Sequence, residues 1–197
     1  TTDIRLSRIS SDGFIDRAGS KLESFYFSTA WLAKKSSLRL NIFSGKEKTY
    51  QAWYGVSAAD LLAGNRTVNY AGSEKPGEPY DNETDNYTQT HYQLFFHQSL
   101  NPKLNFNTAL FLTRGKGYYE QYKADEAYAD YGLPNPGNSD FIRQLWLDNY
   151  FYGSIFSLQY KHQKTQVTLG GAISRYNGDH FGEIIWASNG MPAPTHR

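Results

Sequence analysis

The chain has 197 residues, with 20 Lys or Arg against 19 Asp or Glu and no cysteine. A net charge of +1 leaves no basic excess for binding nucleic acid, and the lack of cysteine excludes disulfides and thiolate metal sites. No apolar run reaches the roughly 18 residues of a membrane-spanning helix. A membrane-spanning β-barrel stays open, because its strands alternate apolar and polar residues.

Aromatic residues make up 16% of the chain, and half of them are tyrosine. Tyrosine joins an apolar ring to a polar tip, which suits strands and boundaries between water and apolar surroundings. Helical periodicity is present only in two short stretches, Ser57–Ala63 and Ala124–Tyr131. We therefore expect an all-β protein.

Alternating apolar and polar residues predict three hairpins along the chain. The hairpins span Phe25–Ile42, Tyr92–Thr113 and Tyr152–Tyr176. Each reverses at a short polar turn, and these turns are Lys34–Ser36, Asn101–Lys103 and Gln163–Lys164. Strands of this length exceed the usual five or so residues of globular proteins and match a tilted membrane crossing of about 9–11 residues.

Further turns are expected outside the hairpins. Ser10–Gly13 forms one near the start of the chain, and the Asn177-Gly178 step favours another. Glu183–Ala187 would then begin an eighth strand. The prediction is an antiparallel up-and-down meander of about seven to eight strands.

The connections between the hairpins are long. They run from about Ser44 to Asn86 and from about Lys123 to Asp140, and both are rich in Gly, Pro, Asn and acidic residues. Compact domains seldom hold such loops without a functional reason. Short turns alternating with long loops place all short turns at one end of the sheet, which is typical of outer-membrane barrels.

Two sets of side chains fit this interpretation. Aromatic residues near the strand ends would form an interfacial girdle, namely Trp31, Tyr118, Tyr119, Tyr122 and Tyr160. Polar residues on the other face of the strands would line the interior, namely Asn105, Asn107, Gln159 and Lys161. The transmembrane barrel therefore has a predicted outside and inside.

Three stretches resemble the barrel portion of TonB-dependent outer-membrane receptors. They are ISSDGFIDR at Ile9–Arg17, LRLNIFSGKEKTYQAW at Leu38–Trp53 and RYNGDHFGEIIW at Arg175–Trp186. The resemblance implies a plugged barrel in the outer membrane of a Gram-negative bacterium. Its implied function is active uptake of a scarce nutrient such as a ferric siderophore or cobalamin, driven by TonB.

The resemblance covers nearly the whole chain but only part of such a receptor. We expect residues 1–197 to be a partial barrel segment that lacks the plug, the signal peptide and the barrel termini. The implied partners are outer-membrane lipid, TonB through the missing plug region and an unidentified small molecule, with no nucleic acid. Because two sheet edges would stay open, the isolated segment is expected to self-associate through them.

Residues capable of catalysis or metal binding do not form a recognisable motif. His91 and His97 share a strand face but lie about 20 Å apart, too far to share a metal. Asp179, His180 and Glu183, and the acidic stretch Glu74–Asp85, could in principle support a glycosidase or a calcium site. We expect no enzyme activity, no metal and no cofactor.

Exposed aromatic residues in the long loops are the candidates for ligand binding, because they can stack on a ligand or hold a cation. These candidates are Tyr50, Trp53, Tyr54, Tyr118, Tyr119 and Trp186. The same residues could instead pin the loops to their neighbours. An alternative function follows from the same composition, a soluble, secreted carbohydrate-binding β-sandwich whose aromatic side chains stack on sugars.

Overall fold

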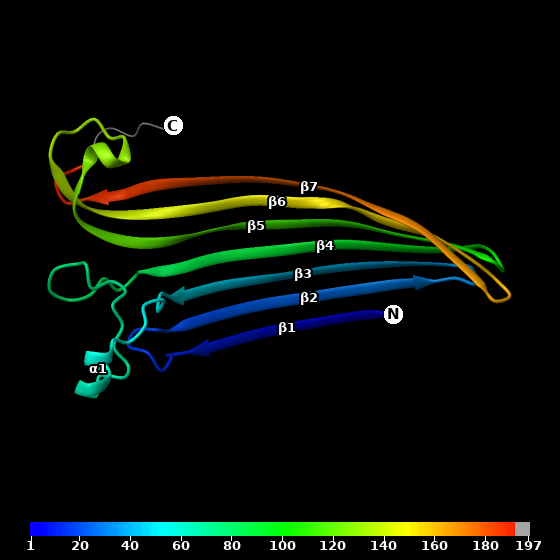
Figure 1. The fold of residues 1–197 in the computed structure, drawn as a ribbon, viewed down its shortest axis with the longest axis horizontal. Coiled ribbons are helices and arrows are strands. Elements are labelled where there is room, and N and C mark those ends of the chain that lie inside the picture. The colour runs from blue at the N-terminus through cyan, green and yellow to red at the C-terminus, as the bar shows by residue number, and fades with distance from the viewer. Residues whose placement is uncertain (192–197) are drawn as a thin grey trace.

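The computed structural model describes residues 1–191 and contains one antiparallel sheet whose seven strands follow each other in chain order (Figure 1). The strands are β1 (Thr2–Ser11), β2 (Ser20–Leu32), β3 (Ser36–Tyr50), β4 (Thr84–Asn101), β5 (Leu104–Ala127), β6 (Asn138–His162) and β7 (Thr165–Ala187). The predicted all-β up-and-down meander is confirmed. Its longest strands, β5 and β6, have 24 and 25 residues.

Short turns and long connections lie at opposite ends of the sheet, as the sequence predicts. The turns 33–35, 102–103 and 163–164 lie at one end, and the connections 12–19, 51–83 and 128–137 lie at the other (Figure 1). We call these the turn end and the loop end. In the first turn the amide of Ala33 donates to the carbonyl of Ser36 at 2.8 Å.

The strands are longer than predicted on both sides of the first long loop. β3 continues to Tyr50 and β4 begins at Thr84, and these two residues form the last pair of the ladder. The connection between them is therefore 51–83. The sequence does not indicate this extension, because polar residues such as Lys46 and Lys48 leave it without the apolar alternation that marks a half-buried strand.

The turn predicted at Asn177-Gly178 is wrong, and so is an eighth strand at Glu183–Ala187. β7 runs through both without interruption. Pairing with β6 accounts for this, since Tyr150 opposes Asn177 and Asn149 opposes Gly178. A complete ladder satisfies the backbone hydrogen-bonding groups and so overrides the local turn preference of the Asn-Gly step.

Within residues 1–191, helical structure is confined to the loop end. Helix α1 (Ala58–Ala63) begins with a capping box between Ser57 and Asp60 and ends at Gly64, whose φ of 83° needs no Cβ. The predicted stretch Ala124–Tyr131 is helical only in its second half, where the 3₁₀ helix η1 spans Tyr128–Tyr131. No helix within residues 1–191 is long and apolar enough to cross a membrane.

The two faces of the sheet differ in chemistry. On the face that we call convex, cross-strand partners are apolar over many rows, as where Leu94 pairs with Leu40 and Leu110. These side chains are open to the surroundings, with Leu6 81%, Leu110 50% and Leu169 70% exposed. The convex face thus carries an apolar band across all seven strands.

The opposite, concave face is more polar, although it also carries aromatic residues such as Phe43 and Phe111. There Asn105 pairs with Gln159, and Lys161 lies two residues nearer the turn than Gln159 on the same face. Asn107, Ser157 and their neighbours continue this face, so the residues predicted to line the interior do share one side of the sheet. A β-sandwich would need a second sheet over the apolar band, and residues 1–191 form a single sheet.

Candidate ligand-binding surface

A hollow of about 870 Å³ lies on the concave face near the loop end, and we call it the loop-end hollow. Its side chains come from two neighbouring cross-strand rows on β3 to β7. They combine aromatic, acidic and apolar groups, namely Glu47, Asp85, Tyr87, Tyr119, Leu145, Leu147 and His180. Such a mixture can hold a ring by stacking and a hydroxyl or cation by its carboxylates.

Glycines keep this hollow open. Gly117 lies between Tyr87 and Leu147 in one row, and Gly182 follows Leu145 in the next. A Cβ on Gly117 would overlap the carbonyl oxygen of Asn86 and stand 2.6 Å from the Cα of Tyr87. The strands approach so closely here that only glycine fits, and its missing side chain leaves space for a ligand.

The first long loop places Trp53 against Tyr119, one of the residues that line the hollow. Its ring meets Tyr119 edge-on, with 5.4 Å between ring centroids and an angle of 72°. Trp53 is 58% exposed, so much of its surface stays open to a ligand. Tyr54 follows it and is 52% exposed. Two residues predicted from the sequence, Trp53 and Tyr119, therefore lie together at a hollow.

A buried carboxylate holds this loop against the sheet. Glu120 is 3% exposed and accepts hydrogen bonds from the Tyr80 hydroxyl at 2.5 Å and from the Asn82 amide at 2.6 Å. Its second oxygen accepts from the Gln144 amide at 2.7 Å. Burial and the bond to Glu120 raise the pKa of Tyr80, so its hydroxyl stays protonated as a donor.

Tyr50 serves the same anchoring purpose and does not face the hollow. It is 6% exposed, and its hydroxyl donates to the carbonyls of Tyr80 at 2.5 Å and Ala71 at 3.2 Å. The guanidinium of Arg17 donates to the Tyr50 hydroxyl and to the carbonyls of Asn69 and Ala71. Tyr50 therefore joins the first long loop to the connection between β1 and β2.

The loop also covers a free stretch of strand edge. Because β4 begins at Thr84, the β5 backbone beyond Tyr119 has no partner strand on that side. Side chains take the place of the strand, as the Gln51 amide donates to the Glu120 carbonyl at 3.2 Å and Glu74 accepts from the Ala124 amide at 3.1 Å.

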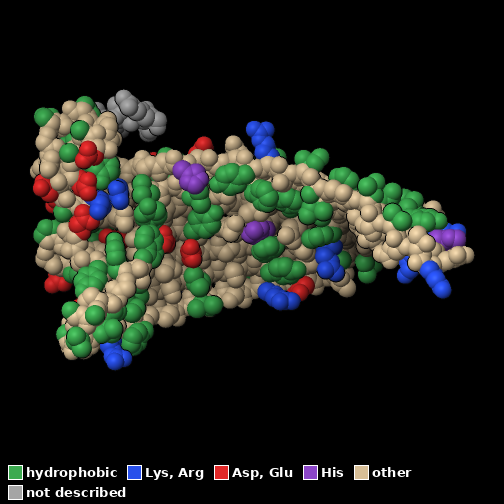
Figure 2. Space-filling view, viewed as in Figure 1, with side chains coloured by type: hydrophobic (Ala, Val, Ile, Leu, Met, Phe, Trp, Pro, Cys, Tyr) green, Lys and Arg blue, Asp and Glu red, His purple; other side chains and the backbone are tan. Residues whose placement is uncertain are grey.

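Glu83 completes this cover from inside the loop. Its carboxylate accepts hydrogen bonds from the backbone amides of Gly72 and Tyr122, and the residue is 4% exposed. Burial is the dominant influence and raises the pKa of Glu83, although the two amides act in the opposite direction. Most acidic side chains visible in Figure 2 likewise lie toward the loop end.

The remaining aromatic candidates lie on the convex face. Strand alternation turns the Tyr118 side chain away from the hollow, so only its backbone borders it. Its ring packs on Trp146 on the convex face, with centroids 4.5 Å apart. Trp146 stacks in turn on Phe181 at 6.0 Å. Trp186 lies 6.3 Å from Tyr122 between centroids. The loop end of the convex face thus carries an aromatic ladder.

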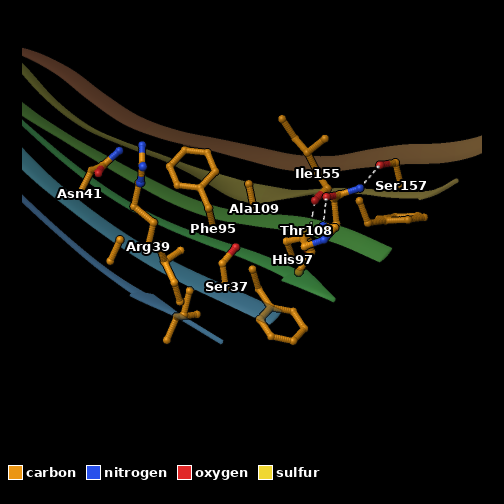
Figure 3. Close-up of a pocket in the computed structure, with 15 residues that line it drawn as sticks. Ser37, Arg39, Asn41, Phe95, His97, Thr108, Ala109, Ile155 and Ser157 are labelled. Carbon is orange, nitrogen blue, oxygen red and sulfur yellow. Dashed lines mark hydrogen bonds between the residues drawn. The ribbon is translucent and has the colours of Figure 1, made fainter. Parts of the chain in front are cut away.

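A second hollow, of about 590 Å³, lies on the concave face toward the turn end (Figure 3). A chain of side-chain hydrogen bonds crosses it, joining His97 Nδ1 to Asn107 Oδ1 at 2.8 Å and the Asn107 amide to Ser157 Oγ at 3.4 Å. Arg39 projects beside Phe95 in this view. The polar groups here are largely paired with each other, which leaves the loop-end hollow as the better ligand site.

The residues considered for catalysis do not converge. Asp179 and His180 are successive strand residues and so point to opposite faces. Across residues 1–191 no group of three or more His, Asp or Glu side chains is placed to hold a metal ion. Sequence reasoning does not find Tyr87, and it considers His180 only as a catalytic candidate. Alternation gives a residue's face but not its neighbours across the sheet, so the place of both residues in the loop-end hollow is not predictable from it.

Comparison with known proteins shows a similarity to a solved structure. No protein-family profile matches the chain, and no curated protein matches it. Among solved structures, the chain is similar to BauA, the ferric preacinetobactin receptor from Acinetobacter baumannii, with a TM-score of 0.62 and 11% identity. The match covers 92% of this chain and 27% of the receptor, so the two share a fold over about a quarter of the receptor's length.

Proposed function

We propose that this chain is a wall segment of a TonB-dependent outer-membrane receptor that takes up a scarce nutrient, such as a ferric siderophore or cobalamin. The observation that carries the proposal is the apolar band, which is exposed on seven successive strands of a single sheet. Soluble proteins rarely expose contiguous apolar surface of this extent. A barrel wall in lipid requires it.

Three other features support the same assignment. The turn end carries Trp31 and Tyr160 on the convex face, 60% and 41% exposed, and the loop end carries the aromatic ladder of Tyr118 and Trp146. Aromatic girdles flank the apolar band of membrane barrels in this way. The fold shared with a siderophore receptor points to the same class.

The loop-end hollow is the proposed place of ligand capture. Trp53 and Tyr119 would stack on a ring or flat chelate, and Glu47 and Asp85 would accept hydrogen bonds from its donors. The segment would act by binding and carry out no covalent chemistry. Coupling to TonB would pass through the plug region that the resemblance implies.

Dependence of folding on detergent tests the membrane assignment. The chain is refolded with and without detergent micelles and followed by circular dichroism and light scattering. Strand signal in discrete particles only with micelles supports the proposal, because the apolar band then needs an apolar solvent. A cooperative, monomeric β-fold in plain buffer would refute it.

Ligand capture is tested separately in micelles. Tryptophan fluorescence is titrated with catecholate and hydroxamate ferric siderophores and with cobalamin, for the wild type and for Tyr119→Ala. Loss of a stacking partner worth about 1 kcal/mol should weaken binding roughly five-fold. Tyr92→Ala, on the convex face and 43% exposed, is the matched control and should leave affinity unchanged. Equal losses of affinity in both variants would show that the ligand does not bind in the loop-end hollow.

A further inference from the structure

Four cations gather on the convex face where the apolar band ends toward the loops. They are Arg8 on β1, Lys21 on β2, and Lys46 and Lys48 on β3, and we call them the cationic patch. Register places them together, since Arg8 opposes Glu23, Glu23 opposes Lys46, and Lys21 opposes Lys48. Four cations against the single carboxylate of Glu23 leave this part of the face with a net charge of +3.

The patch is electrostatically uncompensated within the sheet. Lys21 and Lys48 are direct cross-strand partners, and like charges directly opposite each other destabilise a sheet. In residues 1–191 Lys21, Lys46 and Lys48 form no ion pair. The ammonium of Lys48 donates a hydrogen bond to the neutral side chain of Asn82 at 2.8 Å, and the Arg8–Glu23 contact is a loose one at 3.8 Å. Folding alone therefore gives no reason for this arrangement.

The other half of the same face is neutralised. On β5 and β6, Asp148 binds both Arg114 at 2.5 Å and Lys116 at 3.3 Å, and Asp179 on β7 opposes Asp148, so two cations face two carboxylates. These residues lie in the row of Lys46 or the row next to it. In these rows the excess positive charge thus lies on β1–β3, as expected of a binding surface.

The position of the patch identifies its partner. Leu6 and Phe25 end the apolar band and oppose each other, and Arg8 and Glu23 follow two residues further along the same strands. This inference rests on the proposed function: with the apolar band in lipid, the four cations lie at the depth of the lipid headgroups. Basic clusters next to a membrane-embedded surface attract anionic lipids, with about 1 kcal/mol for each Lys or Arg.

We propose that the cationic patch binds the phosphate groups of lipid headgroups in the surrounding leaflet. The phosphate lies between Lys21 and Lys48 and relieves their mutual repulsion. Lys46 and Arg8 neutralise the remaining charge. The acyl chains of the same lipid pack on Leu6 and Phe25, which are 81% and 41% exposed.

Calorimetric titration of the chain in zwitterionic micelles tests this site. The probe is a short-chain phosphatidic acid, compared with phosphatidylcholine of equal chain length and with inorganic phosphate. Tighter binding of phosphatidic acid than of either comparison compound is expected. The variant Lys21→Gln/Lys48→Gln should weaken that binding about 25-fold, from roughly five-fold for each lysine, and salt should weaken it further.

The matched control is Arg5→Gln/Arg39→Gln, which removes two cations from the concave face of β1 and β3. It should change phosphatidic acid binding by less than about two-fold. Equal binding of the two lipids, an equal loss in the control, or inorganic phosphate binding as tightly as the lipid would each overturn the proposal. Failure to form strands in micelles would instead refute the membrane assignment, and this site with it.

Discussion

The Tyr80 hydroxyl donates a hydrogen bond of 2.5 Å to the carboxylate of Glu120, and this contact joins a loop to a strand 40 residues away in the chain. Asn82 and Gln144 donate to the same carboxylate. One buried side chain on β5 therefore satisfies three donors, two of them from the loop that carries Trp53. The geometry of the loop-end hollow depends on this anchor.

Removal of the anchor should release the loop. Glu120→Ala leaves partly buried donors of Tyr80, Asn82 and Gln144 unpaired, which should cost about 2 kcal/mol of loop docking and raise the open population roughly 30-fold. Trypsin cleavage after Arg66 should accelerate accordingly. Glu126→Ala is the control, because Glu126 makes only an ion pair of 4.0 Å with Lys123. Similar cleavage rates in the two variants would contradict this anchoring.

Loop docking should strengthen as pH falls toward the carboxylic acid range. Burial raises the pKa of Glu83 above its ordinary value of 4.5, so the docked loop binds a proton more tightly than the free loop. Between those two pKa values the docked state holds more protons, and its stability is lost as pH rises through the raised pKa. The wild type should show this slope in its rate of tryptic cleavage as a function of pH, and Glu83→Gln should abolish it. If Glu83→Gln keeps the full slope, another titrating group causes the pH dependence.

A charge within the apolar band should prevent stable insertion. Leu110→Arg places a guanidinium on the convex face, where Leu110 is 50% exposed, and should cost about 2–4 kcal/mol in a bilayer. Ala109→Arg changes the adjacent residue on the concave face, which lines the second hollow toward the turn end, and should be tolerated. Urea titration of the chain refolded in vesicles measures both. A loss of stability for Ala109→Arg with none for Leu110→Arg would mean that the faces are assigned the wrong way round.

Gly153 should be among the glycines least tolerant of substitution. A Cβ there would overlap the carbonyl oxygen of Ile173 and stand 2.8 Å from the Phe111 ring, which lies over the glycine. Gly153→Ala should therefore cost about 1–3 kcal/mol in unfolding free energy. Gly55→Ala is the control, because nothing lies within 4 Å of its added Cβ. Denaturant midpoints in micelles distinguish the two, and an unchanged midpoint for Gly153→Ala would show that the strands can separate at this point.

Sequence periodicity predicted the hairpins and their turns because each depends on neighbours in the chain. Asn101 and Lys103, for example, form their turn locally, with the Lys103 amide donating to the Asn101 side chain at 2.9 Å. The continuation of β7 through Asn177-Gly178 depends on β6 and was not predictable from local signals. The same holds for Tyr87 and His180, which share a row with Gly117 only through the pairing of four strands.

The side chains that cover the β5 edge have a second consequence, which concerns association between molecules. Unpaired backbone groups on an edge can template a strand from another chain. Gln51 and Glu74 occupy those groups at Glu120 and Ala124, so the step left where β4 begins cannot recruit a foreign strand. The first long loop therefore protects the sheet against misassembly at the same place where it supplies Trp53 to the ligand surface.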